Sequence, residues 1–123
     1  MTLSTDDGCF INWKVQHELL HALGFDHEQS RPIRDENVKI NYENIVRGME
    51  YNFEKSSALT IGSPYDYGSV LHFGKHFLSK KGDTITAPEG ICEKIGQRVK
   101  ASEEDIQQVI LLIECVSQCS SVA

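Results

Sequence analysis

The segment His17-Glu18-Leu19-Leu20-His21-Ala22-Leu23-Gly24-Phe25-Asp26-His27 places three histidines and a carboxylate within eleven residues. Residues four apart on an α-helix share one face, about 6 Å apart along the axis, so His17 and His21 can direct their ring nitrogens at one ion. Gly24 follows three residues after His21, where a helix ends most easily on a residue that tolerates positive φ, and the reversed chain can return His27 as a third ligand. The spacing therefore predicts a three-histidine metal site at the end of a helix.

Three neutral histidines suit a zinc ion that keeps one coordination position open for water. Zinc lowers the pKa of a bound water from about 15.7 to roughly 7, so hydroxide is available at neutral pH and hydrolysis is the implied reaction. Glu18 directly follows the first histidine and would border the open position, where it takes a proton from the water instead of binding the metal. We therefore expect His17, His21 and His27 to bind one zinc ion per chain, with Glu18 as the catalytic base.

Two other interpretations of this segment compete with a hydrolytic site. Paired histidines at this spacing can be ordinary helix residues, although five positions of a known pattern coincide here. A zinc site can also be purely structural, but structural sites usually have four protein ligands, often thiolates. No cysteine lies within the segment.

The pattern His-Glu-x-x-His-x-x-Gly-x-x-His resembles that of the metzincin zinc peptidases, and Gly24 to Arg31 resembles the astacin branch, whose signature contains Gly-Phe-x-His-Glu. Further segments resemble the same family: Arg34-Asp35, Tyr51-Asn52-Phe53, Pro64-Tyr65-Asp66-Tyr67, Ser69-Val70-Leu71-His72-Phe73-Gly74, Thr84-Ile85 and Ile95-Gly96-Gln97-Arg98. The resemblance runs from about Gly8 to Cys115 and extends to the hatching-enzyme-like and ovastacin-like members. It implies a secreted zinc metalloendopeptidase, a hydrolase that cleaves protein or peptide substrates through a zinc-bound water.

The implied fold class is α+β, the C-terminal part of an astacin-like metzincin catalytic domain with an active-site helix, a C-terminal helix, short helical turns and a small hairpin. With 123 residues, 40% of them hydrophobic, the chain suits one domain, which the resemblance makes a truncated one. We expect residues 1–8 to be a loose lead-in and residues 116–123 a tail. The family's upstream part, with the edge strand along which a substrate peptide lies, is not matched.

Composition limits the other classes of partner. The net charge of −6 argues against a nucleic-acid partner, and the longest basic run is the pair Lys80-Lys81. No apolar stretch reaches the length of a membrane span. Met1 to Asp7 is polar and acidic, unlike a signal peptide, so the extracellular location rests on the resemblance alone.

Helical periodicity predicts two helices. The first starts near Asn12, and its apolar stripe is expected to be the main buried surface; the stripe consists of Val15, Leu19, Ala22 and Leu23. The second starts after Ser102, a capping residue followed by three acids that the helix dipole favours in the first turn. It is expected to end by Cys115 and to bury Ile106, Val109, Ile110 and Ile113.

Shorter elements are predicted between the helices. Val38 to Ile40 alternates with lysine and predicts a strand, and Leu78 to Ile85 predicts a hairpin around Lys81-Gly82-Asp83. Two helical turns are expected at Glu43 to Val46 and Met49 to Lys55. Within the second, Tyr51 and Phe53 are expected to be packing residues.

The resemblance also shows where this chain departs from the astacin pattern. Leu71 replaces the methionine that forms an apolar floor below the zinc, a volume-conserving change with an expected cost below about 1.5 kcal/mol. Phe73 replaces a tyrosine whose hydroxyl supports the oxyanion. The family residue at Glu28 helps to anchor the mature amino terminus, and Glu28 is expected to lack a partner. His72 and His76 are expected to be structural histidines and not further ligands.

The cysteines complete the sequence-based expectations. Cys9 and Cys115 match family positions that pair with upstream cysteines, whereas Cys92 and Cys119 match none, and three complete pairings of the four thiols are possible. The leading hypothesis is an astacin-type zinc endopeptidase. The alternative is a zinc-binding but catalytically impaired fragment that serves as an interaction or structural module.

Overall fold

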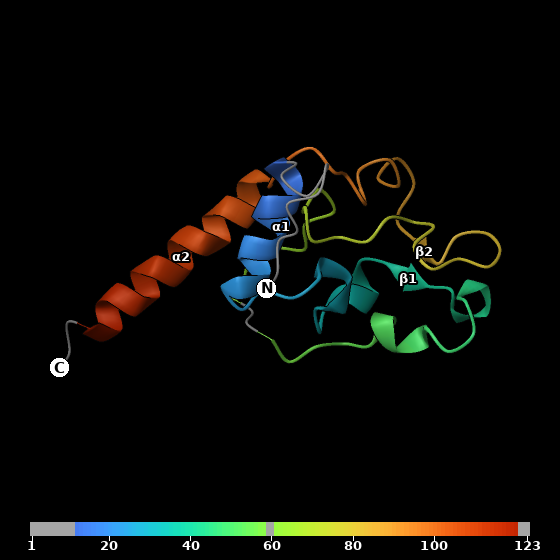
Figure 1. Ribbon diagram of the computed structural model, residues 1–123, viewed down its shortest axis with the longest axis horizontal. Coiled ribbons are helices and arrows are strands. Elements are labelled where there is room, and N and C mark those ends of the chain that lie inside the picture. The colour runs from blue at the N-terminus through green and yellow to red at the C-terminus, as the bar shows by residue number, and fades with distance from the viewer. Residues whose placement is uncertain (1–11, 59–60, 121–123) are drawn as a thin grey trace.

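The computed structural model describes residues 12–58 and 61–120 of the chain. Two α-helices, α1 (Asn12–Ala22) and α2 (Glu103–Ser120), lie at one end of the molecule, and a small antiparallel sheet lies at the other (Figure 1). The part of the chain between the helices forms 3₁₀ turns at Glu28–Ser30, Arg34–Glu36, Tyr42–Asn44 and Glu50–Phe53. The α+β class predicted from the sequence is confirmed, and the two expected helical turns are of the 3₁₀ type.

The end of α1 is fixed by Gly24, as its position in the sequence predicts. Gly24 has φ of 102°, and its N–H donates to the His21 carbonyl at 3.0 Å. The Phe25 N–H donates to the Leu20 carbonyl at 3.1 Å, which completes a Schellman-type helix end. The chain therefore reverses within a few residues of His21, because a glycine supplies the left-handed backbone conformation without steric cost.

The predicted buried face of α1 is wrong. Leu19 and Leu23 are 49% and 46% exposed, whereas Leu20 is buried with Phe25, Val70 and Leu71 in a small apolar cluster. Leucines lie on two sides of α1, and the helical spacing of apolar residues fits either side about equally well. Contact with the turn at residues 69–73 and with α2, rather than periodicity, decides which leucine is covered.

The predicted hairpin over Leu78 to Ile85 is also wrong, although its turn exists. Strand β2 (Ile85–Thr86) pairs antiparallel with β1 (Lys39–Ile40), with Ile40 opposite Ile85, and Ser79 forms an isolated bridge with Ile45. The side-chain amides of Asn41 and Asn44 both donate to the Asp83 carbonyl, at 3.0 and 2.8 Å. These amides attach the loop to a segment some forty residues earlier, so the two arms do not pair with each other.

The main core lies between this sheet and the turn at residues 69–73. It is built around Ile45, Phe53, Phe73 and Ile85, which are all buried. Phe53 is a packing residue as expected, but Tyr51 is 63% exposed, so that expectation is wrong.

Helix α2 begins with a reciprocal capping box. The Asp105 N–H donates to the Ser102 hydroxyl and the Ser102 N–H donates to Asp105 Oδ2, both at 2.9 Å, which confirms Ser102 as the cap. The Asp105 carboxylate also accepts from the Ser69 hydroxyl at 2.6 Å and from the Val70 N–H at 2.9 Å. The first turn of α2 therefore fixes the turn at residues 69–73.

The remaining predictions for α2 are corrected by the structure. The helix continues to Ser120, so residues 116–120 belong to it and are not a tail, and its second half projects away from the other elements (Figure 1). Ile106, Ile110 and Ile113 are 53%, 42% and 59% exposed, so the prediction that they are buried is wrong. Val109 packs against the apolar cluster as expected, and the same side of the helix carries Asp105, Gln108 and Leu112. The hydrogen bonds of Asp105 to Ser69 and Val70 fix the rotation of the helix, which an apolar period does not detect.

Neither helix of the described chain is long and apolar enough to cross a membrane. Of the described cysteines, Cys92 is half-buried, Cys115 and Cys119 are exposed on α2, and none forms a disulfide. Cys9 and the expected lead-in at residues 1–8 lie outside the described residues.

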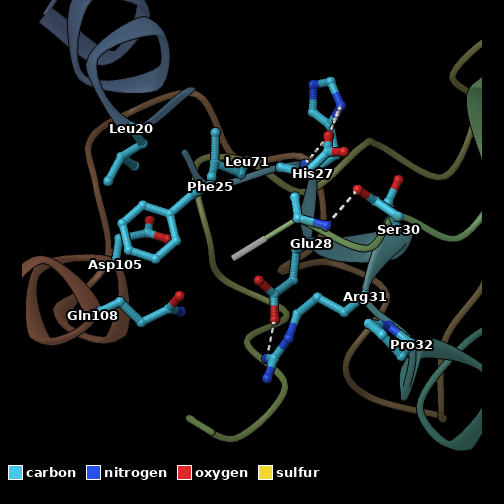
Figure 2. Close-up of a pocket in the computed structure, with 13 residues that line it drawn as sticks. Leu20, Phe25, His27, Glu28, Ser30, Arg31, Pro32, Leu71, Asp105 and Gln108 are labelled. Carbon is cyan, nitrogen blue, oxygen red and sulfur yellow. Dashed lines mark hydrogen bonds and ion pairs between the residues drawn. The ribbon is translucent and has the colours of Figure 1, made fainter. Parts of the chain in front are cut away.

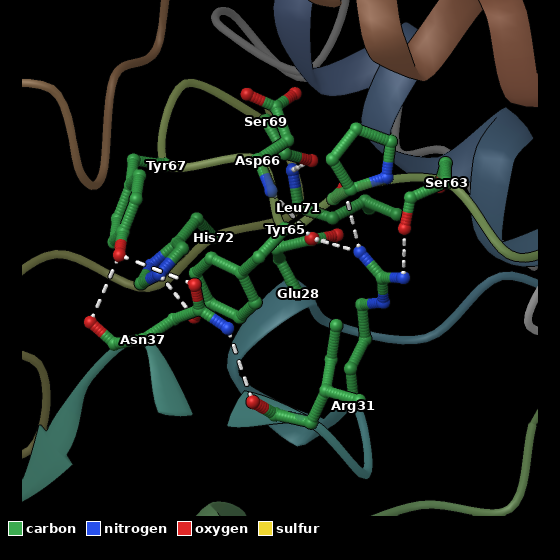
Figure 3. A network of polar contacts seen from close by, with 12 residues as sticks. Glu28, Arg31, Asn37, Ser63, Tyr65, Asp66, Tyr67, Ser69, Leu71 and His72 are labelled. Carbon is green, nitrogen blue, oxygen red and sulfur yellow. Dashed lines mark hydrogen bonds and ion pairs between the residues drawn. The ribbon is translucent and has the colours of Figure 1, made fainter. Parts of the chain in front are cut away.

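His72 is fully buried in the turn at residues 69–73, and its tautomer follows from its partners (Figure 3). Its Nδ1 lies 2.7 Å from the Phe73 carbonyl, which can only accept, so Nδ1 carries the proton. Its Nε2 then accepts from the Tyr65 hydroxyl at 2.7 Å. His72 is therefore a satisfied structural histidine. Burial lowers the pKa of His72 to about 4 and keeps it neutral in the folded protein.

This lowered pKa predicts a loss of stability in acid. Between pH 6.5 and about 4 the unfolded chain protonates this imidazole and the folded protein does not. The free energy of unfolding should therefore fall with pH over this range, by up to about 3 kcal/mol from this group. Urea unfolding in chelator from pH 7 to 4 should show a shallower fall for His72→Gln than for the parent chain. Parallel curves would contradict the assignment.

Candidate metal centre

His17, His21 and His27 come together in the structure as the sequence predicts. His17 and His21 project from α1, and the reversal at Gly24 returns His27 to the same point. One nitrogen of each ring lies within 4.8 Å of the others, and among the described residues these three form the group that can hold a metal ion. The ring centroids of His21 and His27 are 4.6 Å apart, as are those of His17 and His21.

The hydrogen bonds of two rings show that their free nitrogens face each other. His17 Nδ1 lies 2.8 Å from the Val70 carbonyl, and His21 Nδ1 lies 2.8 Å from the Phe25 carbonyl. A carbonyl only accepts, so both Nδ1 atoms carry protons and both Nε2 atoms present lone pairs. These Nε2 atoms are 3.0 Å apart. Two lone pairs at this distance repel each other, and a cation bound between them removes the repulsion, so the donor set fits a zinc ion.

The surroundings of His27 and His17 favour their neutral forms, which metal binding requires. Burial and the nearby His21 and His17 lower the pKa of His27 to about 4. Burial also lowers the pKa of His17, against a hydrogen bond to Val70 that raises it. Glu18 follows His17 on α1, and its negative charge acts on the His17 ring.

The turn at residues 69–73 lies below the histidines. Leu71 is buried beside Leu20 and Phe25, next to a small cavity that His27 and Glu28 also line (Figure 2). The Leu71 carbonyl accepts from the Glu28 N–H at 3.3 Å. Leu71 is therefore packed as an apolar side chain, and its role as a floor below the zinc stays a prediction.

Phe73 packs directly against the third histidine. Its ring centroid is 4.5 Å from that of His27, and its other neighbours are Phe53 and Phe77. An open groove of about 420 Å³ lies beside His27 and Phe73 and is lined mainly by polar side chains. The ring that faces the metal centre from this side carries no hydroxyl.

The expectation that Glu28 lacks a partner is wrong. Glu28 is buried, and its Oε1 accepts from Arg31 Nη1 and from the Asp66 N–H, both at 2.8 Å (Figure 3). Arg31 also donates to the Ser63 and Pro64 carbonyls. Burial raises the pKa of Glu28 against these hydrogen bonds, which lower it. The i, i+3 spacing of Glu28 and Arg31 is the sequence signal that identifies this pair.

Neither of the other two candidate histidines lies in the metal group. His72 is occupied by Tyr65 and the Phe73 carbonyl. His76 is exposed, and its Nδ1 lies 3.1 Å from Asp83 Oδ1. Sequence reasoning missed Asp26, whose carboxylate contacts His27 at 3.5 Å.

Comparison with known proteins identifies relatives of the chain. A sequence model of the astacin peptidase family matches residues 1–113. The chain is 45% identical over 109 residues to low choriolytic enzyme of Oryzias latipes, and this match covers 88% of the chain and 40% of that protein. It is 44% identical over 116 residues to zinc metalloproteinase nas-13 of Caenorhabditis elegans, a match that covers 92% of the chain and 26% of that protein.

The fold agrees with a solved relative. The structure superposes on that of high choriolytic enzyme 1, a hatching enzyme zinc-protease from Oryzias latipes, with a TM-score of 0.81 and 41% sequence identity. The match covers 90% of this chain and 56% of that one. The chain thus spans less than half the length of the curated relatives described above.

Metal removal should loosen the centre locally. The ligands on α1 and the ligand after Gly24 would be joined through the ion, so chelation should raise hydrogen exchange at residues 24–31 before it rises in α2. Mass spectrometry of exchange with and without chelator checks this order. Equal protection of residues 24–31 in both samples would show that no ion links the ligands.

Proposed function

Because the chain belongs to the astacin family of peptidases, we propose that it is a zinc-dependent metalloendopeptidase that hydrolyses peptide bonds in protein substrates. The observation that carries the proposal is the convergence of the His17, His21 and His27 nitrogens, with two Nε2 lone pairs 3.0 Å apart. We further propose that residues 1–123 belong to one astacin-like peptidase domain, and that the protein is extracellular.

In this proposal His17, His21 and His27 hold one zinc ion through their unprotonated nitrogens. When bound, zinc would act as a Lewis acid toward the scissile carbonyl and would lower the pKa of water. Glu18 takes a proton from the attacking water and then delivers it to the leaving amine. The Val70 and Phe25 carbonyls hold His17 and His21 in the tautomer that leaves Nε2 free.

Phe73 limits the expected rate. Phe73 packs against His27 and has no hydroxyl, whereas the tyrosine of the family pattern would supply one to the oxyanion that forms during attack. Loss of one oxyanion donor costs about 10²- to 10³-fold in turnover, or about 3 to 4 kcal/mol, while ground-state packing changes little. We therefore expect peptidase activity to be weak and zinc affinity to be nearly unaffected.

The same observation favours a second candidate function. A chain that binds zinc but lacks the oxyanion donor can serve as an interaction or structural module without turnover. The two functions share the metal ligands and differ in whether Glu18 performs chemistry.

Metal content and cleavage, measured together, test the proposal. The purified chain should contain one zinc ion and cleave casein slowly, and Glu18→Ala should retain the zinc and lose the cleavage, because the base is not a ligand. A zinc-loaded parent chain no more active than Glu18→Ala would select the second function. A parent chain without zinc would exclude both.

Restoration of the hydroxyl tests the role of Phe73. Phe73→Tyr should raise turnover by about 10²- to 10³-fold and leave zinc content unchanged. The assay is best run on the chain itself and on the chain fused to the upstream part of a relative's catalytic domain. An unaltered rate in both would show that another group supports the oxyanion.

A further inference from the structure

The three histidines are oriented by different kinds of acceptor. His17 and His21 direct Nδ1 at the main-chain carbonyls of Val70 and Phe25, which a side-chain substitution preserves as long as the backbone path is unchanged. His27 has a side chain in this place instead: Asp26 Oδ1 lies 3.5 Å from His27 Nδ1. The group that faces Nδ1 of the third histidine is therefore a side chain, and a substitution at position 26 removes it.

Asp26 is itself held in position. Its Oδ1 accepts from the His27 N–H at 2.7 Å, and the Ser56 side chain also hydrogen-bonds to the carboxylate. Ser56 in turn is fixed by its own N–H, which donates to the Ser30 carbonyl at 2.7 Å. Burial raises the pKa of Asp26, but the hydrogen bonds from Ser56 and from the His27 N–H outweigh burial and lower it.

We propose that Asp26 is a positioning residue for the metal centre, whose carboxylate holds His27 Nδ1 so that Nε2 faces the ion. A histidine ligand commonly donates its second N–H to an oxygen acceptor, which fixes the tautomer and increases the basicity of the ligand. The carboxylate also places a negative charge next to three neutral ligands, which favours a dication. The signature Gly-Phe-x-His-Glu leaves this position open, so the family pattern does not itself imply the contact.

The contact with Phe73 does not replace this role. That ring packs on His27 with centroids 4.5 Å apart and an interplanar angle of 49°, and it offers no acceptor to Nδ1. Without Asp26 the imidazole keeps its packing but loses the acceptor that selects the Nδ1–H tautomer. The expected defect is therefore in metal affinity and geometry, not in the fold.

This inference rests on the proposed zinc site, and zinc affinity tests it without an activity assay. The dissociation constant of zinc is measured by chelator competition for the parent chain, Asp26→Ala, Asp26→Asn and Glu54→Ala. Glu54 is the matched control, because it is an acid that lines the same groove beside His27. The visible spectrum of the Co²⁺-substituted proteins reports ligand geometry, and unfolding in chelator reports the fold.

Asp26→Ala should weaken zinc binding by about 10- to 100-fold and alter the Co²⁺ spectrum. Asp26→Asn should weaken it less, because the amide oxygen still accepts a hydrogen bond, and Glu54→Ala should stay within about twofold of the parent. Affinity of Asp26→Ala equal to that of the parent, or an equal loss in Glu54→Ala, would overturn the inference. If Asp26→Ala unfolds in chelator, the inference is tested on Asp26→Asn instead. A stable Asp26→Asn protein with the zinc affinity and the Co²⁺ spectrum of the parent chain would overturn the inference.

The outcomes separate this inference from the proposed function. A parent chain that binds no zinc would overturn both. If the parent chain and Asp26→Ala bind zinc equally tightly, the role of Asp26 is overturned and the proposed function is not affected.

Discussion

The backbone of the turn at residues 69–73 is the constraint on which the rest of the structure depends. The Val70 carbonyl accepts from His17 Nδ1, and the Leu71 carbonyl accepts from the N–H that follows His27 in the chain. The Val70 N–H donates to Asp105 at the start of α2. A single turn therefore sets the tautomer of one histidine, supports the loop that carries another and attaches the second helix.

The polar contacts around this turn are buried, so the loss of one would leave a buried donor or acceptor without a partner and lower the stability of the fold. Asp105 satisfies the Ser69 hydroxyl, the Val70 N–H and the Ser102 N–H together, and loss of its carboxylate would leave several buried donors without an acceptor. Glu28 and Arg31 form a comparable group on the other side, anchored to the carbonyls of Ser63 and Pro64. These networks fix loops that have little regular secondary structure of their own.

The two departures from the astacin pattern in this turn differ in kind. Leu71 changes a side chain whose contribution is apolar volume, and it is buried in the same cluster as Leu20 and Phe25. Phe73 changes a side chain whose contribution is a hydroxyl, and its ring retains its packing against His27 and Phe53. Packing accommodates both side chains, whereas the proposed loss of an oxyanion donor concerns only Phe73.

Features that depend on local geometry followed from the sequence alone. The i, i+4 spacing of His17 and His21, the left-handed Gly24 and the cap at Ser102 each involve residues within a few positions of one another. The tertiary structure alone decided which leucine of α1 is buried and which strand pairs with β2. A period of apolar residues identifies the apolar face of a helix, and a turn signal identifies a reversal of the chain. Neither shows which segment packs or pairs there, because contacts between distant segments, such as those of Asn41 and Asn44 with Asp83, decide it.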